Sequence, residues 1–85
     1  MKTEYTQYPK VGGIYTHYKG GKYEVLTLAV HSETCENHVV YKSVEIGCVY
    51  VRPLHMFFET VENYEGYKIS RFRLFEITKK DIYDL

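Results

Sequence analysis

The sequence has no tryptophan, only two cysteines and two prolines, and no excess of charge of either sign. Its eleven basic and eleven acidic side chains give a formal net charge of zero, which argues against a coat for duplex nucleic acid, because such proteins rely on a positive field. The chain also lacks the roughly 18 apolar residues of a membrane span and the apolar run of a secretory signal. We therefore expect a cytoplasmic protein with no membrane partner, in which Cys35 and Cys48 are free thiols.

What the sequence does contain is tyrosine: ten tyrosines and four phenylalanines in 85 residues. A chain of this length forms one domain that buries only about 60 to 65% of its unfolded surface. Each tyrosine contributes a large apolar ring but needs a partner for its hydroxyl. Such a composition is typical of small sheets with half-wet faces, or of binding surfaces.

Short runs with a period of two, separated by turn signals, predict an antiparallel sheet. In the run 14–19, Tyr15, His17 and Lys19 share one face, and Gly20 and Gly21 then favour a tight turn. The run 22–32 has apolar residues on both faces, which favours a long strand that bends. Further turns are expected at 44–47 and 63–66. The expected strands are 14–19, 22–32, 38–43, 48–52 and 67–77.

The predicted fold class is all-β: a small, SH3-like, strongly bent antiparallel barrel of five to six strands, with one short helical turn near residues 53–58. An OB-like or open roll arrangement remains an alternative. Residues 1–13 are expected to be a lead-in, either flexible or an edge strand, and 14–77 a single β-barrel domain. Residues 78–85 are expected to form a short C-terminal tail.

Arg52 is the first candidate site residue. Strand alternation in 48–52 places Tyr50 and Arg52 on one face and Val49 and Val51 on the other, where we expect the valines to join the core. A ring beside a guanidinium can stack on a planar base while the guanidinium binds a phosphate or carboxylate. The alternative is a cross-strand pair between Arg52 and a glutamate on a solvated face.

A polar loop after the second expected strand supplies the second group of candidates: His31, Ser32, Glu33 and Thr34. Their imidazole and hydroxyl groups can donate hydrogen bonds to an anion or to ribose oxygens. The alternative is that Ser32 and Thr34 cap the backbone of their own turn while Glu33 is solvated. Two further pairs of cations each share an expected strand face and could converge with Arg52: His17 with Lys19, and Arg71 with Arg73.

The segments "YTHYKGGKYEVL", "AVHSETCENHVVY" and "YVRPLHMFFETVE", followed by "RFRL", resemble an uncharacterised bacterial family, a domain of unknown function numbered sixteen fifty-three. The resemblance runs from about residue 14 to residue 74. It departs at 44–47, where the family has a Gly and Asp-rich turn, and at Tyr50, where it has tryptophan. Because the family has no settled activity, the resemblance implies candidate site positions rather than a function. Those positions are 17–20, 31–34, Arg52, Pro53, Arg71 and Phe72.

Neither a metal site nor a catalytic site is indicated. Cys35 and His38 are spaced like one pair of zinc ligands, but a second pair is missing. His31 could be paired with Glu33 or Cys48 as a catalytic base and nucleophile, yet no nucleophile elbow or phosphate loop surrounds these residues. The sequence thus favours a protein without metal or cofactor, and a binding protein over an enzyme.

The predicted function is a non-enzymatic binding module for a small anionic ligand such as a nucleotide or cyclic nucleotide, which a bacterial or phage protein would sequester. Arg52, with Lys19 or Arg71, would meet the phosphate, and Tyr50 would stack on the base. A homodimer is expected, because one small barrel offers little concavity. The alternatives are an SH3-like peptide- or RNA-binding adaptor and a small hydrolase-type enzyme.

Overall fold

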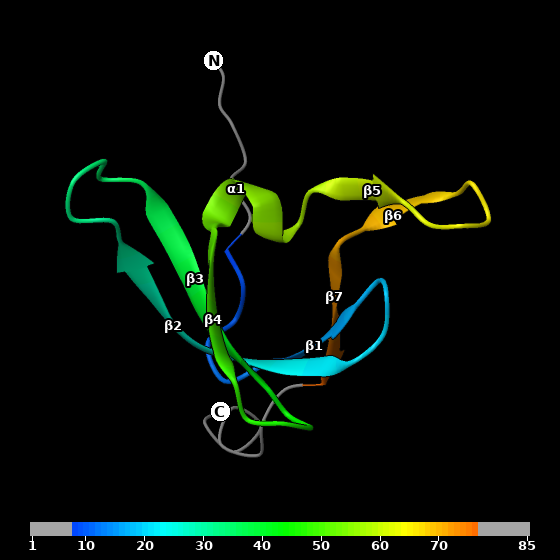
Figure 1. Ribbon diagram of the computed structural model, residues 1–85, viewed down its shortest axis with the longest axis horizontal. Coiled ribbons are helices and arrows are strands. Elements are labelled where there is room, and N and C mark those ends of the chain that lie inside the picture. Colours follow the sequence, from blue (N-terminus) through cyan, green and yellow to red (C-terminus); the bar gives the residue numbers. More distant parts are fainter. Residues whose placement is uncertain (1–7, 77–85) are drawn as a thin grey trace, which may run out of the picture.

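The computed structural model describes residues 8–76, so the expected C-terminal tail and the first seven residues of the lead-in lie outside the described residues. Within residues 8–76 seven strands and one short helix follow one another (Figure 1). Their bounds are β1 Ile14–His17, β2 Lys22–Val30, β3 Asn37–Ser43, β4 Val49–Pro53, α1 Leu54–Phe57, β5 Thr60–Glu62, β6 Lys68–Ser70 and β7 Phe72–Glu76.

Five of the strands form one antiparallel sheet in the order β4-β3-β2-β1-β7, and β5 and β6 form a separate hairpin. The chain leaves the sheet at the end of β4, passes through α1 and the β5-β6 hairpin, and returns as β7 at the opposite edge (Figure 1). The sheet curves so that α1 lies across its open side, and the β5-β6 hairpin projects beyond β7. Within residues 8–76, β4 and β7 therefore each have one strand neighbour.

Two irregularities help to bend the sheet. In β2 the register with β3 shifts between Val25 and Thr27, so that Leu26 is an extra residue. A second shift falls between Ile14 and Tyr15, where β1 pairs with β7. An extra residue in one strand increases local twist and bend, which confirms the bend predicted for the second strand.

The predicted turns are present. The hairpin between β1 and β2 turns through Gly20 and Gly21, which have φ of 106° and 90°. Residues that bear a side chain rarely adopt these backbone angles, whereas glycine adopts them at little cost. The turns at 44–47 and 63–66 also lie where the sequence predicts them.

The core lies between the sheet and α1. We call the sheet face that bears it the inner face. Phe57 of α1 is fully buried and stacks on Phe72 of β7 at a ring-centroid distance of 4.1 Å and an interplanar angle of 5°. The same Phe57 ring meets Tyr15 and Tyr41 edge-on. The buried core residues are Tyr15, Val25, Val39, Tyr41, Leu54, Phe57 and Phe72.

The all-β class, the bent antiparallel sheet and the single short helical turn are confirmed. The sheet is open, however, and does not close into a barrel, because β4 and β7 do not pair. The last expected strand, 67–77, is divided into β6 and β7 at Arg71. There the backbone N–H of Arg71 donates to the carbonyl of Glu59 at 2.9 Å, which ties the bend to the residue before β5.

The expectation that Val49 and Val51 join the core is wrong. These side chains are 57% and 62% exposed, while Tyr50 and Arg52, on the other face of β4, turn towards the core. The reason is the direction of the bend, which encloses the face bearing the tyrosines. No element among residues 8–76 packs over the valines of β4. No helix in this part of the chain is long and apolar enough to cross a membrane.

Candidate functional site

A pocket of about 160 Å³ opens on the inner face of the sheet. Every strand of the five-stranded sheet contributes to its lining. We call it the aromatic pocket, and its lining residues are His17, Tyr23, Tyr41, Tyr50, Arg52 and Phe72.

Strand pairing brings the rings together. Tyr41 and Tyr50 are direct partners on β3 and β4, and their rings stack at a centroid distance of 5.7 Å. His17 and Phe72 are direct partners on β1 and β7, with centroids 4.9 Å apart. Tyr23 of β2 meets the rings on either side edge-on. The buried Phe57 beneath Phe72 supports this arrangement from the core side.

Arg52 extends along this aromatic wall. Its Nε donates a hydrogen bond to the hydroxyl of Tyr41 at 3.1 Å, and its guanidinium carbon lies 5.9 Å from the ring centroid of Phe72. Among residues 8–76 Arg52 has no carboxylate partner, so the cross-strand Arg–Glu pair considered from the sequence is not seen there. The two terminal nitrogens of Arg52, Nη1 and Nη2, make no hydrogen bond with any residue in the range 8–76. The hydroxyl of Tyr41 holds the guanidinium in place and leaves its outer edge open to an acceptor.

The pKa of His17 is affected by burial and by the positive charges around the ring. Its pKa is lowered from 6.5, first by partial burial and then by the positive charges of Arg52, Arg71 and Lys19. Its Nδ1 accepts a hydrogen bond from the backbone N–H of Lys19 at 3.1 Å, which requires that nitrogen to be unprotonated. The neutral ring then carries its proton on Nε2. Three of the cations singled out from the sequence thus lie near enough to His17 to lower its pKa.

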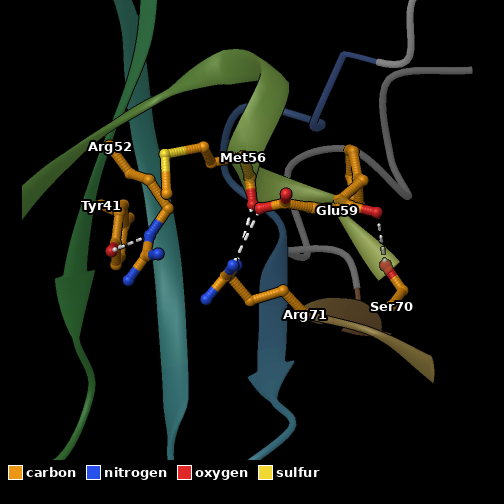
Figure 2. A network of polar contacts seen from close by, with 7 residues as sticks. Tyr41, Arg52, Met56, Glu59, Ser70 and Arg71 are labelled. Carbon is orange, nitrogen blue, oxygen red and sulfur yellow. Dashed lines mark hydrogen bonds and ion pairs between the residues drawn. The ribbon is translucent and has the colours of Figure 1, made fainter. Parts of the chain in front are cut away.

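Arg71 reaches this region while anchored to the α1 segment (Figure 2). Its Nε donates to the carbonyl of Met56 at 2.9 Å, and its Nη2 donates to Oε1 of Glu59 at the same distance. The side chain is only 17% exposed. Figure 2 shows Arg52, from β4, and Arg71, from the bend before β7, both extending beneath α1. Glu59 offsets part of the charge of Arg71, whereas Arg52 has no such partner among the described residues.

The loop containing His31, Ser32, Glu33 and Thr34 connects β2 and β3 and does not line the aromatic pocket. Nδ1 of His31 accepts hydrogen bonds from the backbone N–H groups of Glu33 and Thr34, at 3.1 and 3.2 Å. Oγ1 of Thr34 accepts one from the N–H of Glu36. The bond to Thr34 matches the alternative of local turn capping, whereas the capping by His31 was not predicted and the hydroxyl of Ser32 makes no such bond within residues 8–76. A ligand role for the four residues stays a prediction without support from the pocket geometry.

Sequence reasoning missed two pocket residues, Tyr23 and Tyr41, and it marked Phe72 only through the family resemblance. Tyr41 pairs with Tyr50 across β3 and β4. The sequence does not reveal this pairing, because the register depends on the length of the turn between the two strands. Arg73 does not accompany Arg71, because Arg71 lies at the bend before β7 and strand alternation does not apply there. Arg73 instead lines a separate pocket of about 390 Å³ beside Tyr15 and Leu74.

The lining of the aromatic pocket defines the chemistry that it can perform. Within the described part of the chain it offers ring faces, one guanidinium and one imidazole, and no carboxylate, serine or cysteine of that part lines it. Among residues 8–76 no group of three or more His, Cys, Asp or Glu side chains could hold a metal ion. An arginine beside aromatic rings suits a planar or anionic group, and it disfavours a cation.

Comparisons with known proteins agree with the resemblance read from the sequence. A family model described as "Protein of unknown function (DUF1653)" matches residues 13–74. A crystal structure of a protein belonging to DUF1653 from Bordetella bronchiseptica is 34% identical, with a TM-score of 0.70, over 80% of this chain and 90% of that one. No curated protein matches this chain.

Proposed function

We propose that this protein, which belongs to the DUF1653 family, is a non-enzymatic binding protein for a small anionic ligand of the nucleotide type. One observation carries the proposal. The guanidinium of Arg52 is held by Tyr41 against an aromatic wall, with its outer nitrogens free of hydrogen bonds among the described residues.

Each part of the pocket has a role in this proposal. The outer edge of Arg52 is suited to a phosphate, which accepts two parallel hydrogen bonds from a guanidinium. Tyr50 lies at the rim, stacked on Tyr41, and leaves a ring face for a base. Nε2–H of His17 is a further donor. Lys19 and Arg71 add positive charge around His17 without lining the pocket.

The pocket volume indicates how much of a ligand enters. At about 160 Å³ it is smaller than the roughly 300 to 1,000 Å³ of sites that enclose a drug-sized molecule. We infer that one end of the ligand, a phosphate with the adjoining sugar or base, occupies the pocket. The remainder of the ligand lies over the rim at Tyr50.

Binding without turnover is the simplest chemistry for this lining. Hydrolysis or group transfer needs a nucleophile, a positioned water or a carboxylate that can carry a proton. Among the described lining residues His17 is the one whose ordinary pKa lies near neutral pH, and burial and nearby cations lower that pKa. The protein would act by holding its ligand intact, in the cytoplasm, where the exposed thiols of Cys35 and Cys48 stay reduced.

Thermal unfolding with mononucleotides, cyclic nucleotides and cyclic dinucleotides tests the proposal. A ligand present at about 100 times its dissociation constant adds roughly 2.7 kcal/mol to the native state. For a domain of this size each kcal/mol raises the midpoint by about 4 to 8 °C. We expect one nucleotide class to raise the midpoint of the wild-type protein, and we expect Arg52→Ala to abolish this rise. The matched control Arg73→Ala removes an arginine that lies outside the pocket and should leave the rise intact.

Other outcomes would reject the proposal in distinct ways. If no nucleotide shifts the midpoint, the site does not bind this class of ligand. If RNA or a peptide stabilises the protein and nucleotides do not, the adaptor alternative holds instead. If the ligand is recovered from the denatured complex in altered form, the protein is an enzyme.

A further inference from the structure

The edge strand β4 has a charged residue and a proline only at its C-terminal end, where Arg52 and Pro53 lie. It has a strand partner on one side only within residues 8–76. Natural edge strands are commonly protected by lysines, prolines, bulges or a covering element. From Val49 to Val51 the strand has no charge and no proline, and its two valines are more than half exposed. The β3-β4 turn adds two more exposed aliphatic side chains, Val44 and Ile46.

The backbone of β4 offers a regular set of bonding groups at this edge. The N–H of Ser43 donates to the carbonyl of Cys48 at 2.8 Å, so the backbone groups of Cys48 point towards β3. Because these groups alternate along an antiparallel strand, those of Tyr50 and Arg52 also point towards β3. The N–H and C=O groups of Val49 and Val51 therefore point away from the sheet.

We propose that β4 pairs with β4 of a second copy of this chain, antiparallel and related by a two-fold axis at Tyr50. In this register Val49 lies opposite the second copy's Val51, and the two valine pairs exchange four backbone hydrogen bonds. Tyr50 lies opposite Tyr50 of the second copy. Arg52 lies opposite the second copy's Cys48, so no like charges face each other across the interface.

The neighbouring two-fold registers are less favourable. Centred on Val51, the pairing would place Pro53 opposite Val49, and proline has no N–H to donate. Centred on Val49, it would place Val51 opposite Gly47, which has a φ of 80° and lies in the turn rather than in the strand. Only the axis at Tyr50 uses all the outward groups of both valines.

The pairing would join two aromatic pockets on one continuous sheet. Tyr50 lines the pocket from the edge strand, so Tyr50 of the second copy would lie beside the rim of the first pocket. The two Arg52 residues would be offset by four residues along the strands, about 14 Å at roughly 3.4 Å per residue. A role for this arrangement in binding rests on the proposed function, whereas the pairing itself does not.

The mass in solution tests the interface. The chain weighs 10.1 kDa, and sedimentation of the wild-type protein should give twice that mass, falling to the single-chain mass on dilution. Val49→Lys combined with Val51→Lys places four lysines on one face of the paired strands and should give the single-chain mass at every concentration. The control Val30→Lys alters a β2 side chain that is 61% exposed, like Val51, and should leave the dimer intact. A single-chain mass for the wild-type protein at the highest concentration overturns the proposal.

Cross-linking tests the register. Two Tyr50→Cys residues in a Cys35→Ser, Cys48→Ser background would face each other as a non-hydrogen-bonded pair, with Cα atoms about 4.5 Å apart. This separation permits a disulfide. Val51→Cys in the same background is offset by two residues from its own copy, about 7 Å along the strand, and should not cross-link. Cross-linking of Val51→Cys without Tyr50→Cys would overturn the register.

The interface and the proposed function can fail separately. A dimer whose midpoint responds to no nucleotide rejects the proposed function and leaves the interface standing. A single-chain protein that still binds a nucleotide through Arg52 rejects the interface and leaves the proposed function standing.

Discussion

At the scale of single residues, the account depends on how Arg52 is held. An exposed arginine on a strand would sample many rotamers, and ordering it on binding would cost entropy. Here the Tyr41 hydroxyl and the Phe72 ring fix the side chain before a ligand arrives. The sequence could predict that Tyr50 and Arg52 share a face, because alternation is local. It could not predict Tyr41 as the residue that holds Arg52, because that contact spans two strands.

His17 gives a prediction about pH. Its folded pKa lies below the ordinary value of 6.5, so between the two values the unfolded chain binds more protons than the folded one. The stability that comes from a neutral His17 is therefore complete above about pH 6.5 and is lost as the pH falls towards the lowered pKa. Comparing thermal midpoints at about pH 7.5 and pH 5.5, we expect His17→Gln to lose less stability than the wild-type protein. An equal or greater loss in the variant would show that His17 is not the group responsible.

At the scale of elements, α1 matters more than its four residues suggest. An isolated turn of helix is unstable in water, so α1 forms because Leu54 and Phe57 pack onto the sheet. The sequence predicts such a turn after Pro53. It does not predict that Phe57 stacks on Phe72, because the return of the chain as β7 beside β1 cannot be read from local patterns.

Phe57→Ala tests the support that α1 gives to the pocket. Removing a fully buried ring and leaving a cavity typically costs about 3 to 5 kcal/mol, a large share of the stability of a small domain. Urea unfolding should show this loss. Tyr64→Ala is the control, since Tyr64 is 99% exposed in the β5-β6 turn, and it should change the free energy of unfolding by less than about 0.5 kcal/mol. Equal effects of the two substitutions would contradict the role given to Phe57.

At the scale of the whole molecule, the fold is an open sheet whose inner face is covered by one helical turn, with a hairpin that projects beyond β7 (Figure 1). Composition and turn signals were sufficient for the all-β class. They did not reveal that the sheet stays open, because closure depends on whether β4 meets β7 after a long excursion of the chain. They also misplaced Val49 and Val51, because the direction of the bend decides which face of a strand is buried, and the alternation pattern is the same for both choices.

The most direct test of the central claim is an NMR titration of the ¹³C-labelled protein with the nucleotide that raises the thermal midpoint most. The account predicts that ring resonances of Tyr23, Tyr41, Tyr50 and Phe72 and the side-chain resonance of Arg52 shift in a saturable way. Resonances of His31, Ser32, Glu33 and Thr34 should stay in place. Saturable shifts confined to residues 31–34, with the aromatic pocket unchanged, would show that the ligand binds at the β2-β3 loop and that the pocket assignment is wrong.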